Sequence, residues 1–251
     1  MTRARMIVER RFQVLMLVLA TAVQGATAAQ RAQPAHTLTV TKDGATFLTL
    51  TAEDARLSDV AADLAKQLNV QVIVGTSLKD EKISAQIAGT SIEPAMLAIA
   101  PRVYVDYEMR RNAEPVPLGI YLLGLDDIDP SPSAVVQRTC QGLFLSGNTE
   151  DTGQPPKDAP LRITYDKGRL TVFAKEQSLI AVALAIADQL GVPAEVKYET
   201  REVISADIKE TPMIDDALVG LSYNVRVYVR ADAGRFEKRL LRVVIVPPPA
   251  Q

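Results

Sequence analysis

An internal repeat constrains this chain more than any other feature. The segments 48–70, LTLTAEDARLSDVAADLAKQLNV, and 170–192, LTVFAKEQSLIAVALAIADQLGV, place apolar residues at matching positions when one is shifted by 122 residues. Each begins with the alternating apolar pattern of a strand. Each continues with apolar residues at i, i+3, i+4, i+7 and i+8, which predicts a helix. The repeat indicates one structural unit used twice.

The repeat and the turn residues divide the chain into domains. We expect a first module over residues 37–124 and a second over residues 160–246. Proline and glycine are frequent between them, which is typical of a linker, here residues 125–159. Within it only residues 142–145 are expected to be ordered. Three consecutive prolines open a tail over residues 247–251.

The hydrophobic patterns predict an α+β fold of two tandem βαββαββ-type modules, each with two helices packed on small mixed sheets. In the first module we expect strands at 36–44, 47–50, 70–74, 83–87, 103–109 and 118–123, and a first helix at 57–67. Thr90 or Ser91 is expected to cap the second helix, with Glu93 completing a capping box with Thr90. In the second module Pro212 is expected at the first position of the second helix.

The N-terminus has the features of a secretory signal peptide over residues 1–28. Four arginines lie within the first 13 residues, an apolar run follows at 14–23, and the small residues Ala26 and Ala28 precede a cleavage point. The apolar run is shorter than the roughly 20 residues that a membrane-spanning helix needs. We therefore expect export, cleavage and a periplasmic mature chain without a membrane span.

Composition and charge disfavour nucleic acid as a partner. The chain is 47% hydrophobic and 23% charged, with a net charge of −2. Nucleic-acid-binding proteins normally carry clustered basic charge. The clearest basic cluster lies on the last predicted hairpin and consists of Arg235, Lys238, Arg239 and Arg242. We expect a solvated hairpin tip there, with contact to an acidic partner as the alternative.

The residues available for chemistry are few. His36 is the only histidine and is expected to be exposed ahead of the first strand, which disfavours Ser-His-Asp sites and most zinc sites. Asp126, Asp127 and Asp129 lack the spacing of a calcium loop and are expected to form a solvated turn. Cys140, the only cysteine, is expected to be a lone thiol, or else to form an intermolecular disulfide or act as a reactive thiol. We expect no catalytic residue, metal or cofactor.

The first helix of the second module departs from the amphipathic pattern. Residues 178–187 contain no charged side chain, whereas the corresponding helix of the first module carries Asp59, Asp63 and Lys66. Four apolar residues occupy the face that should be polar: Ile180, Ala181, Leu184 and Ala185. A helix that is apolar on all sides is buried on all sides. Either two sheets cover it within its module, or its outer face packs on the first module or on a partner.

Two motifs of the second module resemble the short N-terminal domain shared by secretins and TonB-dependent receptors. The helix end 187–192, ADQLGV, is similar to the end of the first helix in that family. Residues 211–218, TPMIDDAL, followed by Leu221 and Tyr223, are similar to its second helix. The first module departs from both motifs, with Asn69 in place of the glycine. The resemblance implies two tandem modules of this family without its outer-membrane barrel.

The resemblance also implies a function, namely docking. We expect a periplasmic, non-enzymatic protein–protein docking or adaptor module, accessory to a secretion, pilus or TonB-type uptake or signalling system. Its partner would be a secretin, a TonB-dependent receptor or an inner-membrane component. The alternatives are a periplasmic domain that binds or senses a small ligand and, less favoured, an enzyme. We expect partner contacts by strand addition at Val72, Ile73, Val74 and Val196, and on the helix face at Ile180, Ala181, Leu184 and Ala185.

Overall fold

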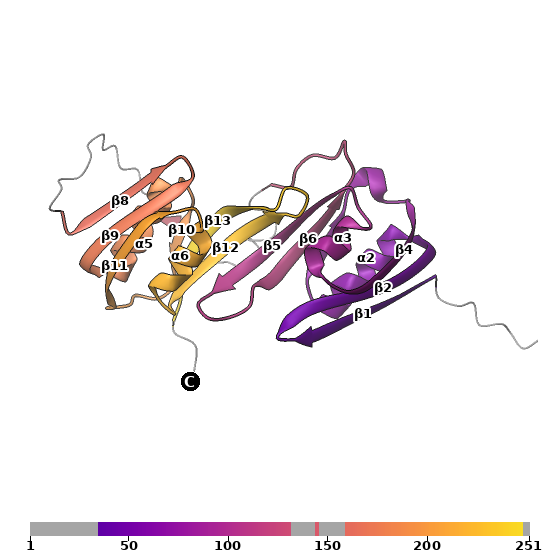
Figure 1. The fold of residues 1–251 in the computed structure, drawn as a ribbon, viewed down its shortest axis with the longest axis horizontal. Coiled ribbons are helices and arrows are strands. Elements are labelled where there is room, and N and C mark those ends of the chain that lie inside the picture. The colour runs from indigo at the N-terminus through magenta and orange to yellow at the C-terminus, as the bar shows by residue number, and fades with distance from the viewer. Residues whose placement is uncertain (1–34, 132–143, 146–158, 248–251) are drawn as a thin grey trace, which may run out of the picture. The chain divides into compact units, whose positions relative to one another are not determined.

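The structure is a computed structural model that describes residues 35–131, 144–145 and 159–247 (Figure 1). The predicted signal peptide, Cys140 and most of the predicted linker lie outside the described residues. The described residues from His36 onward form one compact unit. The fold of this unit is mixed α+β, as expected, with four α-helices and three sheets in the part of the chain that the structure describes.

The first half of the unit runs from β1 to β6. Its elements are β1 (His36–Asp43), β2 (Ala45–Arg56), α2 (Leu57–Leu68), β3 (Gln71–Val74), η1 (Thr76–Leu78), β4 (Lys82–Ser91), α3 (Ile92–Leu97), β5 (Arg102–Arg110) and β6 (Val116–Leu123). The strands β1, β2 and β4 form an antiparallel sheet in that order. Helix α2 ends at Leu68 and is capped by Asn69, whose left-handed backbone, φ 57°, is one that asparagine tolerates well.

The second half repeats this order of elements. They are β8 (Leu161–Asp166), β9 (Arg169–Ser178), α5 (Leu179–Gln189), β10 (Ala194–Val196), β11 (Val203–Thr211), α6 (Ile214–Leu221), β12 (Val225–Asp232) and β13 (Glu237–Ile245). The strands β8, β9 and β11 form the third sheet in the same order as β1, β2 and β4. A two-residue strand, β7 (Phe144–Leu145), precedes them within the predicted linker and bears out the expected order at 144–145, whereas residues 142 and 143 lie outside the described residues.

The remaining strands form one seven-stranded sheet rather than a small sheet in each half. Its order is β3-β6-β5-β12-β13-β10-β7, so β5 of the first half pairs with β12 of the second. Both strands contain the sequence Arg-Val-Tyr-Val, at 102–105 and 226–229. The next residue of each strand is Asp106 or Arg230, and these two residues are directly paired. Asp106 and Arg230 thus occupy equivalent positions in the two strands and lie opposite each other, so the antiparallel pairing is symmetric about this residue pair.

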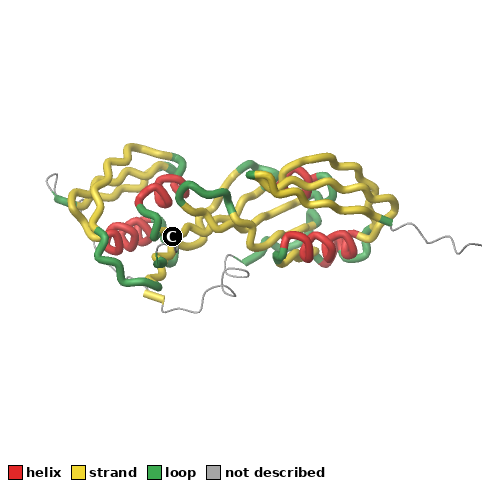
Figure 2. The backbone as a smooth tube through the Cα atoms, turned by 90° about the horizontal axis from the view of Figure 1, so that it is seen from below, coloured by secondary structure: helices red, strands yellow, loops and turns green. Residues whose placement is uncertain are grey.

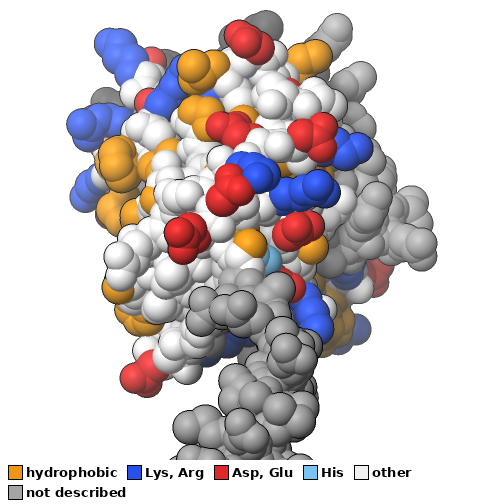
Figure 3. Space-filling model, turned by 90° about the vertical axis from the view of Figure 1, so that its right-hand side faces the viewer, with side chains coloured by type: hydrophobic (Ala, Val, Ile, Leu, Met, Phe, Trp, Pro, Cys, Tyr) orange, Lys and Arg blue, Asp and Glu red, His pale blue; other side chains and the backbone are white. Residues whose placement is uncertain are grey.

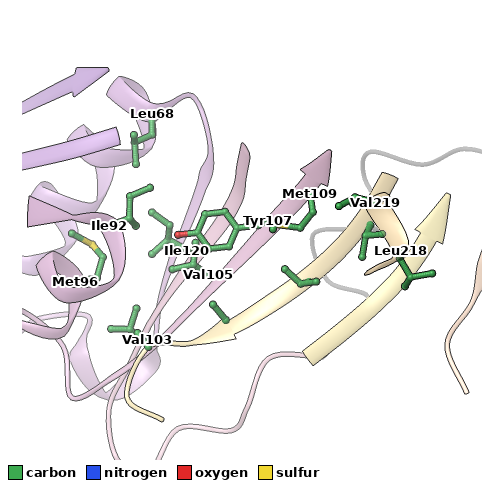
Figure 4. Packing of buried hydrophobic residues seen from close by; sticks show 14 of the residues in the cluster. Leu68, Ile92, Met96, Val103, Val105, Tyr107, Met109, Ile120, Leu218 and Val219 are labelled. Carbon is green, nitrogen blue, oxygen red and sulfur yellow. The ribbon is translucent and has the colours of Figure 1, made fainter. Parts of the chain in front are cut away.

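The helices lie between the sheets. Helix α5 contacts β8 and β9 on one side and β10 and β13 on the other, and α2 contacts β1 and β2 on one side and β3 on the other (Figure 2). One hydrophobic cluster contains residues from both halves. Figure 4 shows Met109 of β5 near Val219 of α6, and α6 packs on β5 as well as on β12. The core is thus continuous across the β5–β12 pairing.

The two outer sheets share an irregularity at corresponding positions. Asp54 and Glu176, 122 residues apart, both have a positive φ of 50°. Their backbone N–H groups donate to the hydroxyls of Ser84 and Ser205 respectively, each at 3.0 Å. A second pair follows the same pattern, because the N–H groups of Gly89 and Glu210 donate to Thr49 and Thr171.

Two expected helix starts differ in detail from the structure. The N-cap of α3 is Ser91, but its side chain makes no capping hydrogen bond, and Thr90 lies in β4 with its hydroxyl donating to the Ala88 carbonyl. The predicted capping box is therefore wrong, because strand pairing continues to the edge of the helix. Helix α6 begins at Ile214, so Pro212 precedes it and does not occupy its first position.

Candidate docking surfaces

Three of the predicted contact residues lie on an edge strand. Val72, Ile73 and Val74 belong to β3, and in the described part of the chain β3 pairs with β6 alone. All three side chains are half-buried. Val72 and Val74 pack against the main core, and Ile73 packs against Tyr121 and Leu123 on the other face of the sheet. Their outward backbone groups can accept another strand.

The fourth predicted edge residue, Val196, lies on β10, which is not a free edge. Strand β7 pairs antiparallel with β10, placing Leu145 opposite Ala194 and Phe144 opposite Glu195. A segment distant in sequence thus already extends this end of the sheet. Glu195 is buried and paired with the buried Arg242, at 3.4 Å from Oε2 to Nη1.

The apolar helix α5 is covered chiefly from within. Leu184 and Ala185 are half-buried and pack against the core, and Ile180 is also half-buried. Ala181 is exposed. The two sheets on either side of α5 already shield most of its apolar surface from water. Burial of this helix therefore does not require a partner protein.

A groove that sequence reasoning missed lies between β11 and α6. It has a volume of about 490 Å³. Its lining residues are Ile204, Ser205, Ala206, Asp207, Ile208, Thr211, Met213, Asp216, Ala217, Gly220 and Leu221. Among the described residues, β11 pairs with β9 only, so its second side is an open edge. The sequence pattern that could have predicted this groove is an alternating strand followed by a helix that carries the small residues Ala217 and Gly220.

A buried polar cluster, also missed, marks the β5–β12 pairing. The Arg230 guanidinium donates to both Asp106 carboxylate oxygens, from Nε at 2.6 Å and from Nη2 at 2.8 Å. It lies 4.8 Å from the ring centre of Tyr121, whose hydroxyl donates to Asp106. Burial, and next the Asp106 charge, raise the pKa of Tyr121 well above its usual range, so the phenol stays a donor. Each buried side-chain nitrogen and oxygen atom of Asp106, Tyr121 and Arg230 has a hydrogen-bond partner. The cluster therefore fits a structural role.

The acidic turn holds the first half to the start of the predicted linker. The Asp127 carboxylate accepts hydrogen bonds from Ser77 Oγ at 2.7 Å, from Thr76 Oγ1 at 3.1 Å and from the backbone N–H groups of Ser77 and Gly124. The Ser77 hydroxyl and then the Gly124 N–H lower the pKa of Asp127 to about 2. Gly75 is required for this close approach, since a Cβ there would lie 2.0 Å from Asp127 Oδ2.

Two expectations about polar side chains are corrected by the structure. His36 begins β1, as the predicted strand 36–44 has it, but its ring is largely buried rather than exposed and lies 2.7 Å from the Asp63 carboxylate on α2. Arg242 does not join a solvated hairpin tip, because it is buried on β13 beside Glu195. In both cases strand alternation turns the side chain toward a neighbouring element. On the face shown in Figure 3, acidic and basic side chains are interspersed.

Comparisons of the chain with family models, with curated proteins and with solved structures found no match. Within the described ranges, no group of three or more His, Cys, Asp or Glu side chains is placed to hold a metal ion. None of the described helices has the length and apolar character that crossing a membrane requires.

Proposed function

We propose that this chain is an exported, non-enzymatic docking protein of the cell envelope, built from two copies of a module resembling the short N-terminal domain of secretins and TonB-dependent receptors. The repeat of 122 residues and the equal strand order of the two outer sheets support the duplication. The matched hydroxyl contacts to Asp54 and Glu176 support it further. The partner would be a secretin, a TonB-dependent receptor or an inner-membrane component.

The observation that carries the docking proposal is the open strand edge. Strands β3 and β11 each have one unpaired side among the described residues, and both place apolar side chains beside it. Strand addition at such an edge supplies backbone hydrogen bonds, while pockets for alternate side chains supply selectivity. The β7–β10 pairing is an example of this mode within the chain itself. We favour these edges over the face of α5, where only Ala181 of the four predicted residues is exposed.

Site-specific photocrosslinking tests docking directly. A photoreactive phenylalanine analogue would replace Val72 beside the β3 edge, Met213 beside the groove, or Phe236 on the last hairpin as a control. Met213 and Phe236 are both exposed, at 59% and 89%. We expect an envelope protein to be captured from position 72 or 213 and not from 236. If no protein is captured from either position 72 or position 213, the docking function is contradicted. If capture from position 236 is equally strong, the assignment of the contact to the strand edges is contradicted.

Export is tested separately with a fusion of residues 1–28 to a reporter enzyme that is active only outside the cytoplasm. We expect activity from the fusion and its loss when Leu17→Arg interrupts the apolar run, because a charge there disfavours insertion. Equal activity of the two fusions would contradict a signal peptide.

A second candidate function is recognition of a small polar molecule. A cavity of about 220 Å³ lies beside the β5–β12 pairing and combines acidic Asp129 and Asp232 with basic Arg235, Lys238 and Arg239. Mixed charge suits a small zwitterion, but the volume is below the roughly 300–1,000 Å³ of typical ligand sites. Saturable thermal stabilisation by an amino acid or similar compound would favour this function over docking.

A further inference from the structure

The groove between β11 and α6 offers three kinds of contact in one place. No other described strand pairs with one side of β11, so backbone groups along that side can pair with an added strand. Ile204, Ala206 and Ile208 alternate along the strand and face the core, so the neighbouring surface toward α6 is apolar. On the helix side, Ala217 and Gly220 are small and leave the groove open. A strand and a helix that border one groove can hold an extended segment between them.

The charge of the groove specifies what enters it. Among the described residues of its lining, Asp207 and Asp216 are the ionisable side chains, and none is a lysine or arginine. Asp207 is paired with Lys209 at 3.4 Å, on the exposed face of the strand. Asp216 lies in the first turn of α6 and has no ion-pair partner among the described residues. An incoming basic side chain would therefore find a carboxylate without a competing cation.

We propose that the β11–α6 groove binds an extended peptide segment of a partner protein, with apolar residues at alternate positions and a lysine or arginine that pairs with Asp216. The segment adds to β11 as a further strand. Its apolar side chains pack against Ala217, Gly220 and Leu221. This proposal rests on the docking function above and names its site and the chemistry of its occupant.

Gly220 provides a variant that fills the groove without disturbing the fold. A Cβ added at this position meets no heavy atom within 4 Å, and the backbone is helical. Leucine is also a better helix former than glycine. Gly220→Leu should therefore keep or raise the melting temperature while it occupies the space that a bound side chain needs. Gly220→Ala is the matched control, because it changes helix propensity and adds only a methyl group.

The probe is a fluorescein-labelled synthetic peptide of alternating lysine and valine, measured by fluorescence anisotropy on the full chain. A glutamate–valine peptide and a lysine–valine peptide interrupted by proline serve as controls. We expect binding of the uninterrupted lysine–valine peptide only. Gly220→Leu should weaken it at least tenfold and Gly220→Ala less than threefold. Asp216→Lys should abolish it and confer binding of the glutamate–valine peptide.

Three results would overturn the proposal. They are no binding at peptide concentrations up to about 1 mM, equal binding of the two charge types, and indifference to both Gly220→Leu and Asp216→Lys. A dimer seen by analytical ultracentrifugation and lost in Gly220→Leu would assign the groove to a second copy instead. If an envelope partner is captured from position 72 but not from position 213, docking stands and the groove assignment fails.

Discussion

The two halves of the molecule have the same order of elements but different surfaces. In the first half β4 is followed by α3, a helix of six residues, whereas in the second half β11 is followed by α6, with eight. In the described part of the chain, one side of β3 is unpaired in the seven-stranded sheet, whereas the corresponding strand β10 pairs with β7. The two halves thus share the strand order of their outer sheets and the positive φ at Asp54 and Glu176, but differ at their edges. Residues that differ between matching positions are therefore the ones to examine for function.

The position where the two halves meet shows the same divergence. Asp106 and Arg230 follow identical Arg-Val-Tyr-Val sequences and face each other across β5 and β12. Two copies of one module would place like charges opposite each other at this point. The actual pair is a buried bidentate ion pair with donor and acceptor groups matched. The difference between the copies thus favours pairing within one chain.

The largest effect is expected from breaking this pair. Asp106→Ala leaves Arg230 buried without its carboxylate, which should lower the free energy of unfolding by about 3–5 kcal/mol. The double variant Asp106→Arg with Arg230→Asp should recover a large part of the loss, because the two positions are symmetric. Urea denaturation followed by circular dichroism measures both. A double variant no more stable than Asp106→Ala would contradict the symmetric pairing.

The next effect tests whether the halves are independent. Leu64 in α2 and Ile186 in α5 are matching positions, and both are fully buried. Leu64→Ala and Ile186→Ala should each cost about 2–5 kcal/mol through lost packing and cavity formation. Because the core is continuous, we expect one unfolding transition in each variant, shifted as a whole. Two separate transitions, each sensitive to only one of the substitutions, would show that the halves unfold independently.

A smaller effect is expected from exchanging residues at a shared bulge. Gly89 and Glu210 both have positive φ, 56° and 45°. That backbone region is unfavourable for glutamate and open to glycine. Glu210→Gly should stabilise the protein, and Gly89→Glu should destabilise it, each by about 1 kcal/mol. A Cβ at Gly89 meets no atom within 4 Å, so steric overlap does not contribute. If the two variants shifted the melting temperature in the same direction, the idea that both positions impose the same backbone strain on a non-glycine residue would be contradicted.

The smallest effect concerns the hydrogen-bonded Asp127 carboxylate of the first half. The pKa of Asp127 is about 2 in the folded chain, below its ordinary value near 4. The ionised carboxylate therefore stabilises the fold above about pH 4, and this contribution is lost as the pH falls through 2. The difference in melting temperature between the unmodified chain and Asp127→Asn should be largest near neutral pH and should narrow below pH 4. A difference that stays constant between pH 6 and pH 2 would contradict it.

Local patterns were enough to predict the secondary structure. The alternating and helical periodicities of 48–70 and 170–192 indicated the strand–helix units that appear as β2–α2 and β9–α5. The expectation for the second helix start failed at Thr90 because side-chain identity suggests a cap but does not show how far strand pairing extends. The sequence did not predict the buried Asp106–Arg230 ion pair, because charged residues in a strand normally face solvent.

The sequence by itself therefore determined the α+β class, the repeat of 122 residues and the position of most elements, because hydrophobic periodicity is local. Only the tertiary structure decided that β5 pairs with β12, that β7 pairs with β10 and that, among the strands the structure describes, none pairs with the side of β11 beside α6. An alternating apolar strand has the same pattern at the centre of a sheet and at its edge. Which edges remain open depends on contacts between distant segments, and the proposed binding surfaces lie at those edges.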